Sequence, residues 1–205
     1  ERSIGTLMTI AENIARIRAN MAAAAREAGR DPKEILLVGA SKMNDAAACR
    51  EAVAAGIDAL GENRVQEMVQ KLEQHAYDGA PLHFIGHLQR NKVKQVVGHV
   101  ALIQSVGSLE LLDEIEKVAA ARGLVQDILL EVNIGREAAK SGFAPEKVLP
   151  AAGAALERTH VRVRGLMTIP PADAQRDANF RYFQEVQALY VDMNQKLFHN
   201  ELEYL

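Results

Sequence analysis

The sequence predicts an α/β fold in which parallel strands alternate with helices, and among such folds a (β/α)8 barrel of the TIM type. Short apolar runs end near residues 41, 63, 86, 106, 134 and 169, and a helical pattern follows most of them. The runs are continuous rather than alternating, which is typical of strands covered by helices. A doubly wound open sheet also fits this order. No nucleotide-binding GxGxxG motif follows a strand, however, so the barrel is the better prediction.

The first elements follow from apolar spacing and from residues that end helices. Apolar side chains at helical spacing, Met8 among them, predict a helix over residues 4–28, and a glycine and a proline close it. A strand over residues 35–41 follows, and then an alanine-rich helix over residues 44–56. Residues 57–63 form the second expected strand. The first helix is therefore an addition to the barrel units.

The order of strand and helix repeats through the rest of the chain. The later expected strands are residues 82–86, 100–106, 127–135 and 161–169, and the expected helices are residues 88–98, 108–123, one opening at Pro145 and one through Phe198. Ser108 is the expected N-cap of its helix. Residues 202–205 resemble the start of a seventh strand. An eight-stranded barrel usually takes about 250 residues, so residues 1–205 are expected to cover six to seven strands of one domain.

Composition excludes several classes of protein. The chain has 205 residues, 48% of them hydrophobic and 25% charged, as in soluble globular proteins. A net charge of −3, 4% aromatic residues and no tryptophan argue against a nucleic-acid partner. No apolar run has the length of a membrane helix. Cys49 is the only cysteine, so a reducing, cytoplasmic setting is expected.

Lys42 is the most informative single residue. It ends the apolar run ILLVGASK, at the C-terminal end of an expected strand. A buried amine at that position would favour its neutral form, which can attack a carbonyl carbon and form a Schiff base. A lysine that extends from the strand end to solvent is the alternative interpretation.

An ordered series of motifs between residues 39 and 171 points further: GASK, GENRVQE, HFIGHLQRNK, QSVGS, EVNIGREAAKSG and GLMTIPP. Together they resemble the pyridoxal phosphate homeostasis proteins (the YggS/PROSC family), whose fold is a single-domain barrel of the alanine racemase N-terminal type. The resemblance implies that Lys42 carries pyridoxal 5′-phosphate (PLP) as an aldimine. It also implies that Asn63 lies beside the cofactor and that Met167 approaches the pyridine ring. His83 and Ser105, at the ends of two other expected strands, are further candidates for cofactor binding.

The sequence departs from the family at its end. Family members continue beyond residues 202–205 into a serine-rich and an arginine-containing segment that bind the phosphate and face the pyridine nitrogen, and neither segment is present here. The resemblance therefore implies that residues 1–205 belong to a single PLP-binding barrel domain and that the C-terminal strands of this domain are missing from the sequence. Weak PLP binding, or none, is expected of these residues alone.

Three functions compete at this stage. The first is a non-catalytic PLP carrier that acts in intracellular PLP homeostasis, has PLP and apo PLP-enzymes as partners, and is a monomer. The second is a racemase-like PLP enzyme, which needs a second acid or base opposite the lysine, and no second domain is present to supply one. The third is a cofactor-free Schiff-base aldolase, which would want acidic residues near its lysine. The sequence favours the carrier.

Two other patterns have simpler interpretations. His83 and His87 flank FIG, but no carboxylate or cysteine stands near them in sequence, so packing is a better explanation than a metal site. Lys140 lies in a loop after an expected strand and is a second lysine that could receive PLP. A solvated loop lysine is the more economical interpretation of Lys140.

Overall fold

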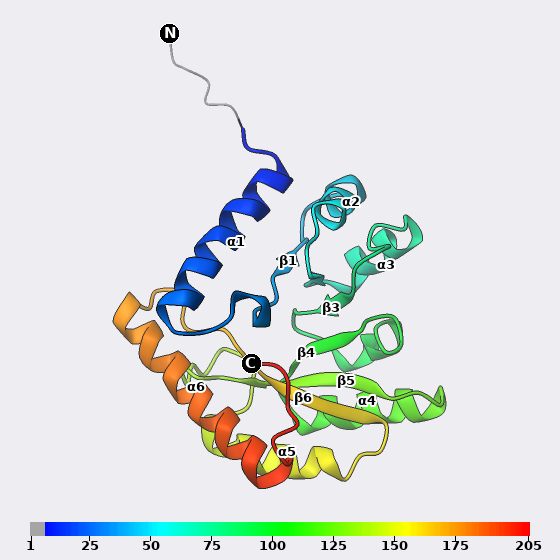
Figure 1. The fold of residues 1–205 in the computed structure, drawn as a ribbon. Helices are drawn as coiled ribbons and strands as arrows, with labels where there is room; N and C mark the ends of the chain where they lie inside the picture. The colour runs from blue at the N-terminus through cyan, green and yellow to red at the C-terminus, as the bar shows by residue number, and fades with distance from the viewer. Residues whose placement is uncertain (1–6) are drawn as a thin grey trace. The chain divides into compact units, whose positions relative to one another are not determined.

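The computed structural model describes residues 7–205, and within them strands and helices alternate (Figure 1). The strands are β1 Val38–Ala40, β2 Ala59–Glu62, β3 Leu82–Phe84, β4 Leu102–Val106, β5 Gln126–Val132 and β6 Val161–Thr168. The α-helices are α1 Ile10–Glu27, α2 Ala46–Ala54, α3 Val65–Glu73, α4 Leu109–Ala121, α5 Val148–Leu156 and α6 Arg176–Leu197. The strands form a parallel sheet in the order of the chain. The predicted α/β fold class is confirmed.

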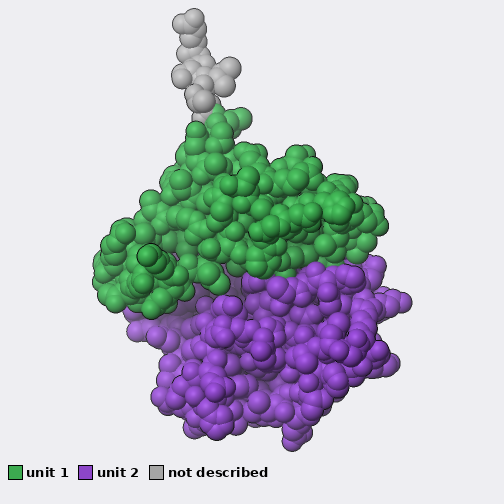
Figure 2. Space-filling model, turned by 45° about the vertical axis from the view of Figure 1, so that its right-hand side comes forward, with its two compact units in different colours: residues 1–62, 66–82 green, residues 63–65, 83–205 purple. Residues whose placement is uncertain are grey.

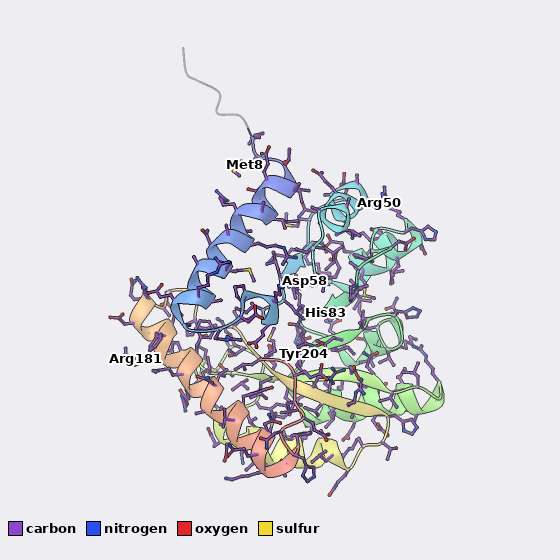
Figure 3. All side chains as sticks on the ribbon, in the orientation of Figure 1. Met8, Arg50, Asp58, His83, Arg181 and Tyr204 are labelled. Atoms are coloured by element: carbon purple, nitrogen blue, oxygen red, sulfur yellow. The ribbon has the colours of Figure 1, made fainter. Side chains whose placement is uncertain are left out.

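The extra N-terminal helix exists but begins later than predicted. Thr9 caps α1: its side chain accepts a hydrogen bond from the N–H of Glu12 at 3.1 Å, and its own N–H donates to the Glu12 carboxylate at 3.0 Å. This reciprocal capping box fixes the first turn at Ile10. Met8, labelled in Figure 3, precedes the helix and is 44% exposed. Residues 4–6 of the predicted helix lie outside the described residues.

The strands end close to the predicted positions. Their last residues are 40, 62, 84, 106, 132 and 168, against predicted ends near 41, 63, 86, 106, 134 and 169. Ser108 caps α4 as expected, since its hydroxyl accepts from the N–H of Leu111 at 3.2 Å. Tyr204 forms a parallel bridge with Gly165 of β6, where a seventh strand was expected to start.

One predicted helix was assigned the wrong type. The segment expected as a helix over residues 88–98 contains the 3-10 helix Arg90–Gln95, and two more 3-10 helices span Pro32–Glu34 and Pro145–Lys147. Gly98, three residues after the 3-10 helix Arg90–Gln95, has φ 83°, a backbone conformation that favours glycine. A strand-to-strand connection here is made without an α-helix.

The chain divides into two compact units, coloured separately in Figure 2. The first takes the chain up to Glu62 and residues 66–82, and the second takes residues 63–65 and 83–205. Cys49, Leu60 and Met68 belong to the core of the first unit. In the second, α4, α5 and α6 pack against neighbouring strands, and α5 packs against α6, around a core that includes Ile103 and Leu130. The prediction of one domain stays a prediction.

Candidate functional site

Lys42 lies in the tight turn that connects β1 to α2 in the first unit. The N–H of Asn44 donates to the carbonyl of Ser41 at 3.1 Å, so Lys42 and Met43 are the central residues of this turn. β1 ends at Ala40, Ser41 takes the last buried position at 5% exposure, and the Lys42 side chain is exposed. The expected burial of Lys42 is therefore wrong, because the strand stops two residues before the lysine.

The residue after Lys42 has an unusual backbone conformation. Met43 has φ 63° and is 89% exposed. A left-handed conformation costs a residue with a Cβ atom about 1–2 kcal/mol, and an exposed side chain gains no packing that offsets this cost. The N–H of Met43 donates to the carboxylate of Glu67 on α3 at 2.6 Å. A side chain of a neighbouring helix thus helps to hold the strained turn.

A buried polar cluster stands behind this turn. We call it the Glu62 cluster, and it consists of Ser41, Glu62, Lys71 and Tyr77. Glu62, at the end of β2, is fully buried, and its Oε1 accepts from Ser41 Oγ at 2.5 Å, from Lys71 Nζ at 2.6 Å and from the Tyr77 hydroxyl at 3.0 Å. Lys71 Nζ also donates to the Ser41 carbonyl at 2.7 Å and to Glu67 Oε1 at 2.9 Å.

The protonation states of the cluster follow from its burial and charges. Burial opposes the charge on Lys71, but its hydrogen bonds to the carboxylates of Glu62 and Glu67 outweigh this effect and raise its pKa. Burial, together with the adjacent negative charge of Glu62, also raises the pKa of Tyr77 far above its ordinary value. Lys71 therefore stays an ammonium and Tyr77 a neutral hydroxyl donor.

Sequence reasoning missed Lys71. Glu67 and Lys71 are four residues apart on α3, a spacing that on most helices marks an exposed ion pair. What separates this pair from an exposed one is its position in the fold: Met68, between the two residues in sequence, is fully buried, and Lys71 itself is only 5% exposed. The lysine that sequence reasoning expected to be buried is exposed, and a lysine that it passed over is buried.

Two of the predicted cofactor neighbours, Asn63 and Ser105, lie against Gly86 in the second unit. Gly86 lies so close to Asn63 that a Cβ atom on Gly86 would stand 2.2 Å from the Asn63 carbonyl oxygen. The Ser105 hydroxyl is buried and donates to the Gly86 carbonyl at 2.5 Å. The side-chain oxygen Oδ1 of Asn63 is buried and has no hydrogen-bond partner in the described part of the chain. Asn63, Gly86 and Ser105 thus form a tight group with one unused acceptor.

The contacts of His83 and Met167 involve other residues than this group. His83 on β3, labelled in Figure 3, has its Nδ1 2.9 Å from Nε2 of Gln104, and burial lowers its pKa. Met167 on β6 is in register with Glu131 on β5. Burial raises the pKa of the Glu131 carboxyl group, to which the Ser141 hydroxyl donates at 3.2 Å. A half-buried carboxyl group is therefore next to Met167 in the sheet.

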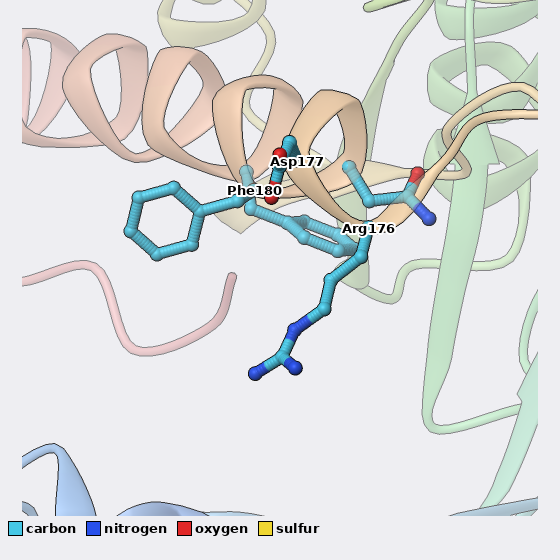
Figure 4. Close-up of a pocket in the computed structure, with 5 residues that line it drawn as sticks. Arg176, Asp177 and Phe180 are labelled. Atoms are coloured by element: carbon cyan, nitrogen blue, oxygen red, sulfur yellow. The ribbon is translucent and has the colours of Figure 1, made fainter.

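The remaining candidates are surface features. Lys140 Nζ lies 3.0 Å from the carboxylate of Glu137, and both side chains are exposed. Between residues 7 and 205, no three histidine, cysteine or acidic side chains gather as a metal site would require. A pocket on α6 is lined by Arg176, Asp177, Asn179, Phe180 and Phe183, all from one helix (Figure 4). It contains none of the predicted site residues.

No helix in the described part of the chain has the length and apolar character needed to cross a membrane.

Comparison with known proteins identifies a family for the chain. Residues 13–202 match the family described as alanine racemase, N-terminal domain. The chain is 39% identical over 188 residues to the pyridoxal phosphate homeostasis protein of Pseudomonas aeruginosa. The aligned region covers 92% of this chain and 82% of that protein.

Solved structures extend this comparison to the fold. The PipY protein of Synechococcus elongatus, in a structure with PLP bound, superposes with a TM-score of 0.79 at 28% identity over 95% of this chain and 85% of that one. An alanine racemase of Clostridium difficile has a TM-score of 0.67 at 18% identity, over 90% of this chain and 47% of that one. The second likeness concerns the fold alone.

Proposed function

The chain belongs to the alanine racemase N-terminal domain family and, within it, to the pyridoxal phosphate homeostasis proteins, and on this premise we propose that it is a PLP carrier. In this proposal Lys42 holds PLP as a Schiff base, and the protein turns over no substrate. Apo PLP-enzymes are the receivers. The position of Lys42, exposed in a turn at the end of β1, carries the proposal.

The chemistry of Lys42 suits this role. Its amine would hold PLP by condensation with the aldehyde carbon and loss of one water, so the bond would need no further reactant. An exposed amine is open to a cofactor that must enter and leave. The N–H of Asn44 donates to the Ser41 carbonyl, and the N–H of Met43 donates to the Glu67 carboxylate. The lysine is therefore anchored at its Cα while its side chain remains accessible.

The second unit contains a group that fits a polar ligand. The buried Oδ1 of Asn63 lacks a partner among the described residues, and an unused buried acceptor is costly unless a ligand or water satisfies it. PLP carries hydroxyl and ring groups that can supply hydrogen bonds. His83, Ser105 and Met167 remain proposed cofactor neighbours. Of these, Ser105 contributes by holding the Gly86 carbonyl.

The state of Tyr77 supports the carrier over the racemase-like enzyme. A racemase needs a second acid or base that gains and loses a proton near the lysine. Tyr77 is buried, its hydroxyl donates to Glu62 at 3.0 Å, and its raised pKa keeps its proton in place. It is therefore poorly suited to proton exchange.

The first test locates the cofactor. The protein, expressed as its complete reading frame, is incubated with PLP, reduced with borohydride and mapped by peptide mass spectrometry. We expect the pyridoxyl group on Lys42, because its amine is exposed and its backbone is fixed. Lys42→Ala should lose both the label and the visible absorbance, and Lys140→Ala should keep both. A label on Lys140 with Lys42 unmodified would contradict the assignment, and a protein that never gains PLP absorbance would favour the aldolase.

The second test concerns turnover. Incubation of the PLP-loaded protein with L- or D-alanine and serine should give no racemisation or transamination above that of free PLP, because Tyr77, the buried tyrosine of the unit that contains Lys42, keeps its proton. Chiral chromatography of the amino acid measures this. A turnover number near the enzymatic median of about 10 s⁻¹ would show that the protein is an enzyme.

A further inference from the structure

Both peptide groups that flank the Cα atom of Lys42 are held by side chains of α3. The carbonyl of Ser41, in the peptide group before Lys42, accepts from Lys71 Nζ at 2.7 Å. The N–H of Met43, in the peptide group after it, donates to Glu67 Oε1 at 2.6 Å. The two peptide planes set the direction in which the Lys42 side chain leaves the backbone, since only φ and ψ of this residue lie between them.

The two side chains also hold each other. Lys71 Nζ donates to the same Oε1 atom of Glu67 that accepts from Met43, at 2.9 Å. Its third contact, to the fully buried Glu62 at 2.6 Å, ties it to the end of β2. Charge-assisted hydrogen bonds of this kind are short and geometrically demanding, so the positions of Lys71 and Glu67 are tightly defined.

The turn needs such support. Met43 keeps a left-handed backbone conformation although its side chain is 89% exposed and gains little from packing. Strained backbone of this type persists only where the surroundings fix it, and it is concentrated at functional sites. The contact from Glu67 falls on the strained residue itself.

We propose that Lys71 and Glu67 form a clamp that positions Lys42 for reaction with the cofactor. This inference rests on the proposed function, because it assigns these two residues a role in Schiff-base formation at Lys42. Lys71 and Glu67 are positioning residues and touch neither the aldehyde nor the reacting amine. Without the clamp, the Lys42 amine is still present but samples many directions, and fewer of them lead to reaction.

The test compares the rate at which Lys42 is pyridoxylated in variants of the complete protein. Aliquots are reduced with borohydride at intervals, and the fraction of Lys42 that carries the label is measured by peptide mass spectrometry. Lys71→Met keeps most of the side-chain length and removes the ammonium, and Glu67→Ala removes the acceptor at a less buried position. We expect both to slow labelling of Lys42 about tenfold, equivalent to about 1.4 kcal/mol.

Tyr77→Phe is the matched control. It removes a hydrogen bond to the same Glu62 carboxylate but touches neither peptide group of Lys42. Its stability, measured by urea unfolding, should fall while its Lys42 labelling rate stays within twofold of the unmodified protein. Exchange of the Met43 amide hydrogen, followed by NMR without PLP, should accelerate in Glu67→Ala and not in Tyr77→Phe.

The outcomes separate the two proposals. If labelling falls in all three variants in proportion to their loss of stability, Lys71 and Glu67 are merely structural and the clamp is refuted. If labelling is unchanged in Lys71→Met and Glu67→Ala, the clamp is also refuted, while Lys42 remains the PLP lysine. If the unmodified protein is never labelled on Lys42, the proposed function itself fails and the clamp fails with it. Should Lys71→Met not fold, Glu67→Ala decides.

Discussion

Glu62→Ala is expected to lower the free energy of unfolding by about 3–5 kcal/mol, the usual cost of removing one partner of a buried ion pair. Glu62 is fully buried, and its Oε1 atom accepts three hydrogen bonds. Its loss leaves the ammonium of Lys71 buried with less compensating charge and leaves the hydroxyls of Ser41 and Tyr77 without their acceptor. Urea unfolding followed by circular dichroism measures the change.

The control for this prediction is another glutamate of the same region. Glu73 is the last residue of α3 and is exposed, so Glu73→Ala should change stability by no more than about 0.5 kcal/mol. The loss of stability in Glu62→Gln should lie between those of Glu62→Ala and Glu73→Ala, because glutamine keeps an acceptor and loses the charge. A loss below about 1 kcal/mol in Glu62→Ala would mean that the Glu62 cluster contributes little to folding.

Gly86→Ala is expected to disturb both stability and PLP binding. The added Cβ atom would stand 2.2 Å from the carbonyl oxygen and 2.6 Å from the Cα atom of Asn63, so the backbone itself must move. Overpacking of this kind costs about 1–3 kcal/mol. Because the Gly86 carbonyl also accepts from Ser105, the displacement reaches both proposed cofactor neighbours. Urea unfolding and titration with PLP, followed by absorbance, measure the two effects.

A second glycine provides the control. Gly153 lies within α5, and a Cβ atom there would meet nothing within 4 Å. Gly153→Ala should therefore leave PLP binding unchanged and raise stability by up to about 1 kcal/mol, the difference in helix propensity between the two residues. If Gly86→Ala behaves like Gly153→Ala, the close approach to Asn63 has no functional weight.

Much of the fold could be predicted because its signals are local. A strand can be recognised as an apolar run that ends at a polar residue, and β1 and β4 end within one residue of the predicted positions. Ser108 was recognised as a cap because a hydroxyl before an apolar helix has few other uses. The start of α1 was misplaced because the apolar spacing continued upstream of Thr9, and the capping box with Glu12 ended it.

The site was harder to predict because burial depends on packing between elements distant in sequence. The burial expected for Lys42 depended on a strand that continues to Ser41, whereas β1 ends at Ala40. The burial of Lys71 depends on contacts of α3 with Ser41, which follows β1, and with Glu62, the last residue of β2, and residue spacing on a single helix does not reveal it. The assignment of Lys42, Asn63 and Met167 to the cofactor came from family motifs and stays a prediction.

The contacts around Lys42 also constrain which sequences this turn accepts. A peptide chain has a direction: the carbonyl before Lys42 needs a hydrogen-bond donor, and the N–H after it needs an acceptor. Lys71 donates to the carbonyl, and Glu67 accepts from the N–H. Exchange of the two, with lysine at 67 and glutamate at 71, would preserve the ion pair and the net charge but oppose donor to donor and acceptor to acceptor. The positions of lysine and glutamate in this pair are thus determined by the donor and acceptor groups of the backbone that they contact, and not by their charges alone.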